Sequence, residues 1–160
     1  MTLYYWIVDE FLHHVPELAE EYGYQRISAQ ESDPLIPDEY KQISADLEAR
    51  YPSAIREPPG EPGLTLLFED QLVPLIVELG RAQQEGRVSA IFHWIEDLAK
   101  HPSFDVRNLV ASGVCESLIT THASVLPAIV RFMGPQTKAL CVMQFDQYII
   151  PPQLQALLRS

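Results

Sequence analysis

Apolar side chains recur every three or four residues along most of this chain, which is the spacing of one face of an α-helix. Residues 3–12 place apolar side chains at positions 3, 4, 7, 8, 11 and 12. Pro16 and the acidic residues that follow it are typical of the first turn of a second helix, residues 16–28. After a loop with two prolines, the pattern predicts a third helix over residues 37–51.

A segment rich in proline and glycine, residues 52–63, ends this first group, since five of its last six residues are Pro or Gly. Beyond it, helical spacing returns in six stretches, and Pro74 either kinks the first of them or divides it in two. The predicted helices cover residues 64–82, 88–101, 105–118, 123–133 and 135–149, and residues 151–160 are expected to form a terminal helical turn or two. A polar turn is expected between Gly80 and Gly86. Because alternation with a period of two and Asn-Gly or Asp-Gly turns are absent, we expect an all-α fold in one domain, residues 1–160, with about seven or eight helices.

Residues 88–118 form a predicted helix, a polar turn and a second helix that begins Asp105-Val106-Arg107. This order resembles the start of the second helix in HEAT-like repeats, where the Asp accepts from free backbone N–H groups, the Val enters the core and the Arg packs along the next repeat. Either Ser103 or Asp105 is the expected cap. The resemblance implies HEAT-like antiparallel hairpins over residues 63–160, with residues 1–62 as an acidic helical cap over their open end.

The net charge of −11 is distributed unevenly along the chain. Residues 1–62 carry 13 acidic and 4 basic side chains, a net of −9, whereas residues 63–160 carry 9 and 7, a net of −2. Such a chain repels polyanions, so we expect no nucleic-acid partner. It attracts a basic protein and raises the rate of their encounter. An acidic composition that serves only solubility remains the alternative.

The stretches "WIEDLAKHPSFDVRNLVASGVCESL" and "FMGPQTKAL" resemble a group of small helical bacterial immunity proteins of polymorphic-toxin and contact-dependent growth inhibition systems. The shared pattern is an acidic "E-D-L" helix, a polar turn, "D-V-x-N-L-V", an "E-x-L" helix end and a "G-P-x-(S/T)-(K/R)" helix start. It covers roughly residues 88–145, and its matching positions are Glu96, Asp97, Leu98, Asp105, Val106, Asn108, Leu109, Val110, Glu116, Leu118, Gly134, Pro135, Thr137 and Lys138.

This resemblance implies a protein that binds a cognate bacterial toxin domain and neutralises it by blocking the active site or substrate groove. Since many such toxins act on nucleic acid through basic surfaces, carboxylates of the first 62 residues are the expected contacts, in place of a phosphate backbone. The partner-binding candidates are Glu20, Glu21, Glu31, Asp33, Asp38, Glu39, Glu57 and Glu61. The alternative is a HEAT-like adaptor or scaffold without enzymatic activity.

Catalytic and metal-binding chemistry has little support in the sequence. His13 and His14 point about 100° apart on a helix, and zinc needs three or four ligands. A nucleophile built from Cys115 and His122 would place its thiol in an apolar helical stripe, whereas reactive thiols prefer electropositive helix starts. We therefore expect no catalytic residue, no metal and no cofactor.

Two further expectations concern polar pairs and location. Of Glu96 and Asp97, one is expected to receive Arg107 in a structural ion pair, and a catalytic role is the weaker alternative. Cys115 and Cys141 are expected to be free buried thiols. No apolar run approaches the ~20 residues that span a bilayer, and the first residues lack a basic signal region. We expect a cytoplasmic protein without membrane association.

Overall fold

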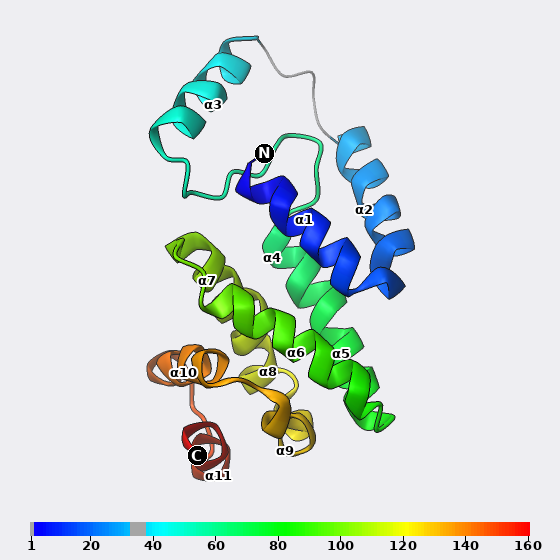
Figure 1. The fold of residues 1–160 in the computed structure, drawn as a ribbon, viewed down its shortest axis with the longest axis vertical. Helices are drawn as coiled ribbons and strands as arrows, with labels where there is room; N and C mark the ends of the chain where they lie inside the picture. The colour runs from blue at the N-terminus through cyan, green and yellow to red at the C-terminus, as the bar shows by residue number, and fades with distance from the viewer. Residues whose placement is uncertain (1, 33–37) are drawn as a thin grey trace.

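The all-α prediction is confirmed by the computed structural model, which describes residues 2–32 and 38–160 and contains only helices among its regular elements there. The described residues form nine helical runs, against the seven or eight predicted (Figure 1). The N-terminal runs are α1 (Leu3–His14), α2 (Ala19–Ser32) preceded by the 3₁₀ turn η1 (Pro16–Leu18), and α3 (Asp38–Arg50). The first middle run is one helix made of α4 (Leu64–Leu66), η2 (Leu67–Leu72) and α5 (Val73–Arg81). The second is α6 (Glu85–Ala99). The third is one helix made of α7 (Phe104–Val110), η3 (Ala111–Cys115) and α8 (Glu116–Thr120). The C-terminal runs are η4 (Ala123–Val125), α9 (Leu126–Ile129) and η5 (Val130–Phe132) together; α10 (Pro135–Met143), followed by the turn η6 (Phe145–Gln147); and α11 (Pro152–Arg159).

Most predicted boundaries lie within a few residues of the observed ones. The segment 52–63 contains no helix, as predicted. The predicted first residue of the third helix, Pro37, lies outside the described residues. The polar turn is shorter than expected, because α6 already begins at Glu85 and includes Gly86. Only residues 82–84 connect α5 to α6.

Pro74 neither divides nor ends the helix of residues 64–81: it is the second residue of α5, which follows the π-helical segment η2 without a break. A proline has no N–H to donate to the carbonyl four residues earlier, and its ring crowds that carbonyl; the wider π turn accommodates both effects. The helix Phe104–Thr120 contains a second π segment, η3. The two π segments meet where Gly113 faces Phe68, and a Cβ at position 113 would lie 3.0 Å from the Phe68 Cβ.

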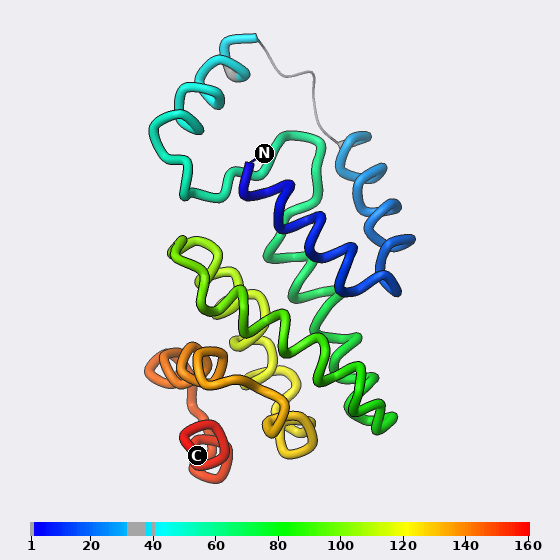
Figure 2. Tube along the Cα trace, viewed as in Figure 1, coloured from blue at the N-terminus to red at the C-terminus, as the bar shows by residue number. Residues whose placement is uncertain are grey.

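Helix α1 belongs to the main hydrophobic core, although it lies in the acidic part of the chain. Its residues Tyr4, Ile7, Val8 and Phe11 are buried in the same cluster as the buried face of α6. The charge boundary near residue 62 therefore does not separate two cores. Figure 2 shows the chain descending from α1 and the loops at one end of the molecule to α10 and α11 at the other.

The buried carboxylate of Glu96 holds the start of α10. Its oxygens accept hydrogen bonds from the backbone N–H of Gln136 at 2.8 Å, from the backbone N–H of Thr137 at 2.9 Å and from the Thr137 hydroxyl at 2.7 Å. Glu96 is only 6% exposed. In place of water, these three donors and the positive end of α10 stabilise its carboxylate. A Cβ at Gly134 would overlap the Glu96 carboxyl group, and this close approach requires glycine there.

The predicted ion pair of Arg107 with Glu96 or Asp97 is wrong. The Arg107 guanidinium instead donates to the carbonyl oxygens of His101 and Pro102, each at 2.7 Å. Since these carbonyls belong to the turn after α6, Arg107 closes the connection between α6 and α7.

The predicted side-chain cap of α7 is also wrong. Ser103 occupies the N-cap position but makes no capping hydrogen bond, and Asp105 is already the second helical residue. The Asp105 carboxylate accepts from the Ile55 N–H at 2.9 Å, and the Ser103 hydroxyl donates to the Ser53 carbonyl. Both side chains therefore hold the proline-rich loop against α7.

Among the described residues, no single helix is long and apolar enough to cross a membrane; Phe104–Thr120 and Ala123–Phe132 meet those criteria only as a pair, and they are bent by 83°.

Gln83 ends α5 with a left-handed backbone, φ = 59°. The N–H groups of Gln83 and Gln84 donate to the carbonyls of Gly80 and Leu79, which is the Schellman arrangement. The position after a helix end in this arrangement favours glycine, because a Cβ there crowds the backbone.

Replacing Gln83 with glycine should raise the free energy of unfolding by about 0.5–1 kcal/mol, since the left-handed conformation then carries no Cβ. Urea unfolding of Q83G and Q83A measures the effect. Q83A keeps the Cβ and should not gain stability. Equal stabilities of Q83G and the unsubstituted protein would contradict this account of the α5 end.

Replacing Glu96 with glutamine should lower the free energy of unfolding by about 1–3 kcal/mol, because a buried acceptor is replaced by an amide N–H₂ that faces backbone donors. The control is D97N, an adjacent exposed residue with the same change of charge, for which we expect at most about 0.5 kcal/mol. If E96Q and D97N unfold at the same urea concentration, Glu96 does not hold α10 as described.

Candidate protein-binding surface

Helix α2 has one face toward the protein and one toward solvent. Glu20, Tyr24, Ile27 and Glu31 lie on its solvent side, at spacings of four, three and four residues that form one stripe. Tyr24 is 62% exposed and Ile27 is 55% exposed. These four residues, called the outer stripe of α2 below, place two large apolar side chains between two carboxylates about 16 Å apart along the helix.

The opposite face of α2 is fixed by Glu61 of the proline-rich loop. The Glu61 carboxylate accepts from Arg26 Nε, with N–O distances of 3.0 and 3.2 Å, and from the Tyr22 hydroxyl at 3.5 Å. Its side chain is 7% exposed. The Tyr4 hydroxyl of α1 donates to the Pro62 carbonyl at 2.7 Å. Residues 61 and 62 of the proline-rich loop therefore contact both α1 and α2.

The tyrosines around Glu61 are held in their neutral form. Burial, and then the charge of Glu61, raise the pKa of Tyr22. The pKa of Tyr4 is raised by burial, and further by Tyr22 and Glu61. The pKa of Arg26 is raised by its hydrogen bond to Glu61. All three groups therefore act as hydrogen-bond donors to the loop, and none of them is activated as a base.

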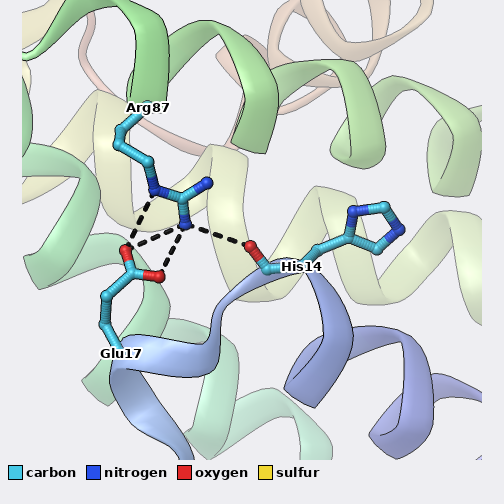
Figure 3. Close-up of polar contacts among 3 residues, drawn as sticks. All are labelled: His14, Glu17 and Arg87. Carbon is cyan, nitrogen blue, oxygen red and sulfur yellow. Dashed lines mark hydrogen bonds and ion pairs between the residues drawn. The ribbon is translucent and has the colours of Figure 1, made fainter.

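A second attachment fixes the start of α2 to α6. Figure 3 shows the Arg87 guanidinium between the Glu17 carboxylate and the His14 carbonyl oxygen, with N–O distances of 2.7 to 3.2 Å to Glu17 and 3.0 Å to His14. His14 also stacks on Trp94 of α6, with ring centroids 5.2 Å apart. The turn between α1 and α2 is therefore positioned by α6.

Helix α3 lies outside the main core and has no buried residue among its described side chains. Ile43 is 53% exposed and stands between Glu39 and Asp46, four residues before it and three after it. This order of an acidic, an apolar and an acidic residue repeats the order of the outer stripe of α2. In Figure 1 α3 stands apart from the helices of the core.

The structure separates the partner-binding residues predicted from sequence into two groups. Five belong to α2 and α3, and they are mostly exposed: Glu20, Glu21, Glu31, Asp38 and Glu39. They do not form one cluster, because Glu20 and Glu21 lie at the start of α2 and Glu31 at its end. Asp38 and Glu39 occupy the first turn of the next helix.

The other predicted partner-binding residues have internal contacts or are not described. Glu57 accepts from the Leu64 N–H at 2.9 Å and thereby caps α4. Glu61 is engaged by Arg26 and Tyr22. Asp33 lies outside the described residues. The contact of Glu57, Glu61 and Asp33 with a partner stays a prediction.

The sequence pattern did not identify Tyr24, Ile27 and Ile43 as surface residues. A signal was present in α2, where Tyr22 and Tyr24 are 200° apart around the axis and cannot both face one core. Because only one of these two tyrosines can face the core, the other must lie at an exposed position.

The remaining sequence candidates are the metal-ligating side chains and the two cysteines. Within residues 2–32 and 38–160, no group of three His, Cys, Asp or Glu side chains is placed to hold a metal ion. Cys115 and Cys141 are buried free thiols, as predicted. Burial, and then the neighbouring Cys141, raise the pKa of Cys115 well above its ordinary value, so its nucleophilic thiolate form is disfavoured.

Comparison with known proteins identifies one family. The family model described as "Domain of unknown function (DUF7674)" matches residues 8–149, from the middle of α1 to the segment before α11. No curated protein and no solved structure matches the chain.

Replacing Glu61 with glutamine should loosen α2 without unfolding the core. We expect amide hydrogen exchange in α2 to become roughly two- to fivefold faster, because the lost ion pair involves a half-exposed arginine and is screened by solvent. Exchange in α6 should not change. E31Q, which removes the same charge from the outer stripe of α2, is the control, and equal acceleration in E31Q would contradict the anchoring role of Glu61.

Proposed function

The chain belongs to the DUF7674 family, and we propose that it is an immunity protein, which binds a cognate basic toxin domain and blocks its active site or substrate groove. The outer stripe of α2 carries this proposal. Protein-binding surfaces typically combine a few large apolar or aromatic side chains with a polar rim. Tyr24 and Ile27 supply the apolar part, and Glu20 and Glu31 supply the rim.

The charge of the surface favours a basic partner. The exposed carboxylates of α2 and α3 belong to the part of the chain with a net charge of −9. A surface of this sign attracts a toxin whose substrate groove binds nucleic acid, and it accelerates their encounter. Carboxylates at the ends of α2 would then occupy positions that phosphates take in the substrate.

The anchoring of α2 supports the same proposal. Glu61 holds the middle of the helix through Arg26, and Arg87 holds the turn before it through Glu17. A helix fixed on its inner face loses little conformational freedom when its outer face binds, so less of the interaction free energy is lost to ordering.

Residues 63–160 have a supporting role in this proposal. Helix α6 packs against both α5 and α7, to which short turns connect it, and this is the kind of contact that HEAT-like hairpins make. We propose that they form a HEAT-like scaffold beneath an acidic helical cap, and that the protein acts in the cytoplasm, where an immunity protein meets an incoming toxin. The second candidate function is a HEAT-like adaptor without enzymatic activity. The observation that favours it is the exposed side chain of Phe104 in α7.

A growth competition tests the proposal. A strain without the gene, mixed with its toxin-releasing parent, should be outcompeted, and the intact chain supplied from a plasmid should protect it. The double variant Y24A/I27A should lose protection, because truncating an aromatic residue at the centre of an interface commonly costs about 2 kcal/mol or more. The variant E20Q/E31Q should bind the toxin more weakly, and with a smaller dependence on salt.

Two matched double variants serve as controls. M143A/I149A removes two exposed apolar side chains far along the chain, and E78Q/D97N removes two exposed carboxylates of α5 and α6. Both should protect as well as the intact chain. If the strain without the gene survives beside its parent, the protein is not an immunity factor. If the Y24A/I27A variant still protects, its partner binds elsewhere.

A further inference from the structure

A cavity of about 520 Å³ lies between the turn that joins α5 to α6 and the helical run of α9 and η5. Its wall includes the apolar side chains of Leu79, Val88 and Phe132. Its rim includes polar and charged side chains from both sides: Arg81, Gln83, Gln84, Glu85 and Arg131. The volume falls in the range of sites for single small molecules, roughly 300–1,000 Å³. In Figure 1 this turn lies at the other end of the molecule from α3.

The charge at the rim is opposite in sign to the charge of the chain. Arg81 has no hydrogen bond or ion pair with any part of the chain that the structure describes. Arg131 pairs with Glu85, and its guanidinium carbon lies 4.7 Å from the centre of the Phe132 ring. The residues that line the cavity thus include two arginines and one carboxylate, in a protein with a net charge of −11. Guanidinium groups bind carboxylates and phosphates through paired, charge-assisted hydrogen bonds.

The backbone at the cavity rim is held in a conformation that disfavours its own residue. Gln83 has φ = 59°, where glycine would be more stable, and its side chain lines the cavity. The cavity also includes residues of the first turn of α6, where the helix dipole favours negative charge.

We propose that this cavity binds a small organic anion, in which a carboxylate or phosphate group meets Arg81 and Arg131 and an apolar body lies against Leu79, Val88 and Phe132. The anionic group follows from the positive rim, and the apolar body from the wall. This site is separate from the outer stripe of α2 and does not depend on the proposed immunity function.

Phenyl phosphate is the probe, because it combines both parts of the ligand. Inorganic phosphate supplies the anion alone, and benzyl alcohol supplies the ring alone. In titrations followed by NMR, phenyl phosphate at millimolar concentrations should shift the signals of Arg81, Gln83 and Arg131 in a saturable way. It should bind more tightly than either half. If inorganic phosphate binds as tightly as phenyl phosphate, the apolar wall plays no part and the proposal fails. If benzyl alcohol binds as tightly as phenyl phosphate, the arginines play no part and the proposal also fails. Benzoate in place of phenyl phosphate distinguishes a carboxylate from a phosphate site.

Variants separate this site from general attraction of anions. R81M should weaken phenyl phosphate binding by about tenfold, the effect of one charge-assisted contact. R50M removes an equal charge at the exposed end of α3 and should bind as the intact protein does. Absence of saturable shifts, or equal losses in R81M and R50M, would overturn the proposal.

Discussion

The structure depends on one buried carboxylate, that of Glu96, which satisfies the first donors of α10. An unpaired buried charge is strongly destabilising, so the position of α10 follows from the position of α6. Gly134 leaves the space for this contact, and Thr137 adds a hydroxyl donor to it. Three positions that are far apart in the sequence, Glu96, Gly134 and Thr137, therefore meet in one interaction.

Helix α6 connects the two halves of the molecule through polar contacts near its two ends. Near its start, Arg87 holds the turn before α2 through Glu17, and near its end Glu96 holds α10. Between them the helix is mostly buried, and α1 packs into the same core. The acidic part of the chain is thus fixed to the core by α1 and by a few polar contacts. Its other helices, α2 and α3, keep their outer faces exposed to solvent.

Local patterns were sufficient to predict the helices, and long-range polar contacts were not. The spacing of apolar residues predicts α1 and α6, since the period of a helix is a property of the local chain. Asp105 is one of the two residues predicted to cap α7, since capping is a common local role of an aspartate near a helix start. It bonds instead to Ile55, fifty residues away, and Arg107 bonds to the carbonyls of the preceding turn. Such partners depend on which loops the folded chain brings near.

The sequence by itself determined the all-α class, the helix positions and the concentration of negative charge before residue 63. These follow from hydrophobic period, proline and glycine positions, and composition, all of which are local or additive. Only the tertiary structure decided which carboxylates remain available. Glu61 and Glu31 have the same chemistry, yet Glu61 is buried beneath α2 and Glu31 lies on its outer stripe. The difference arises because burial depends on the packing of α2 against a distant loop, and the chemistry of a residue does not specify its packing.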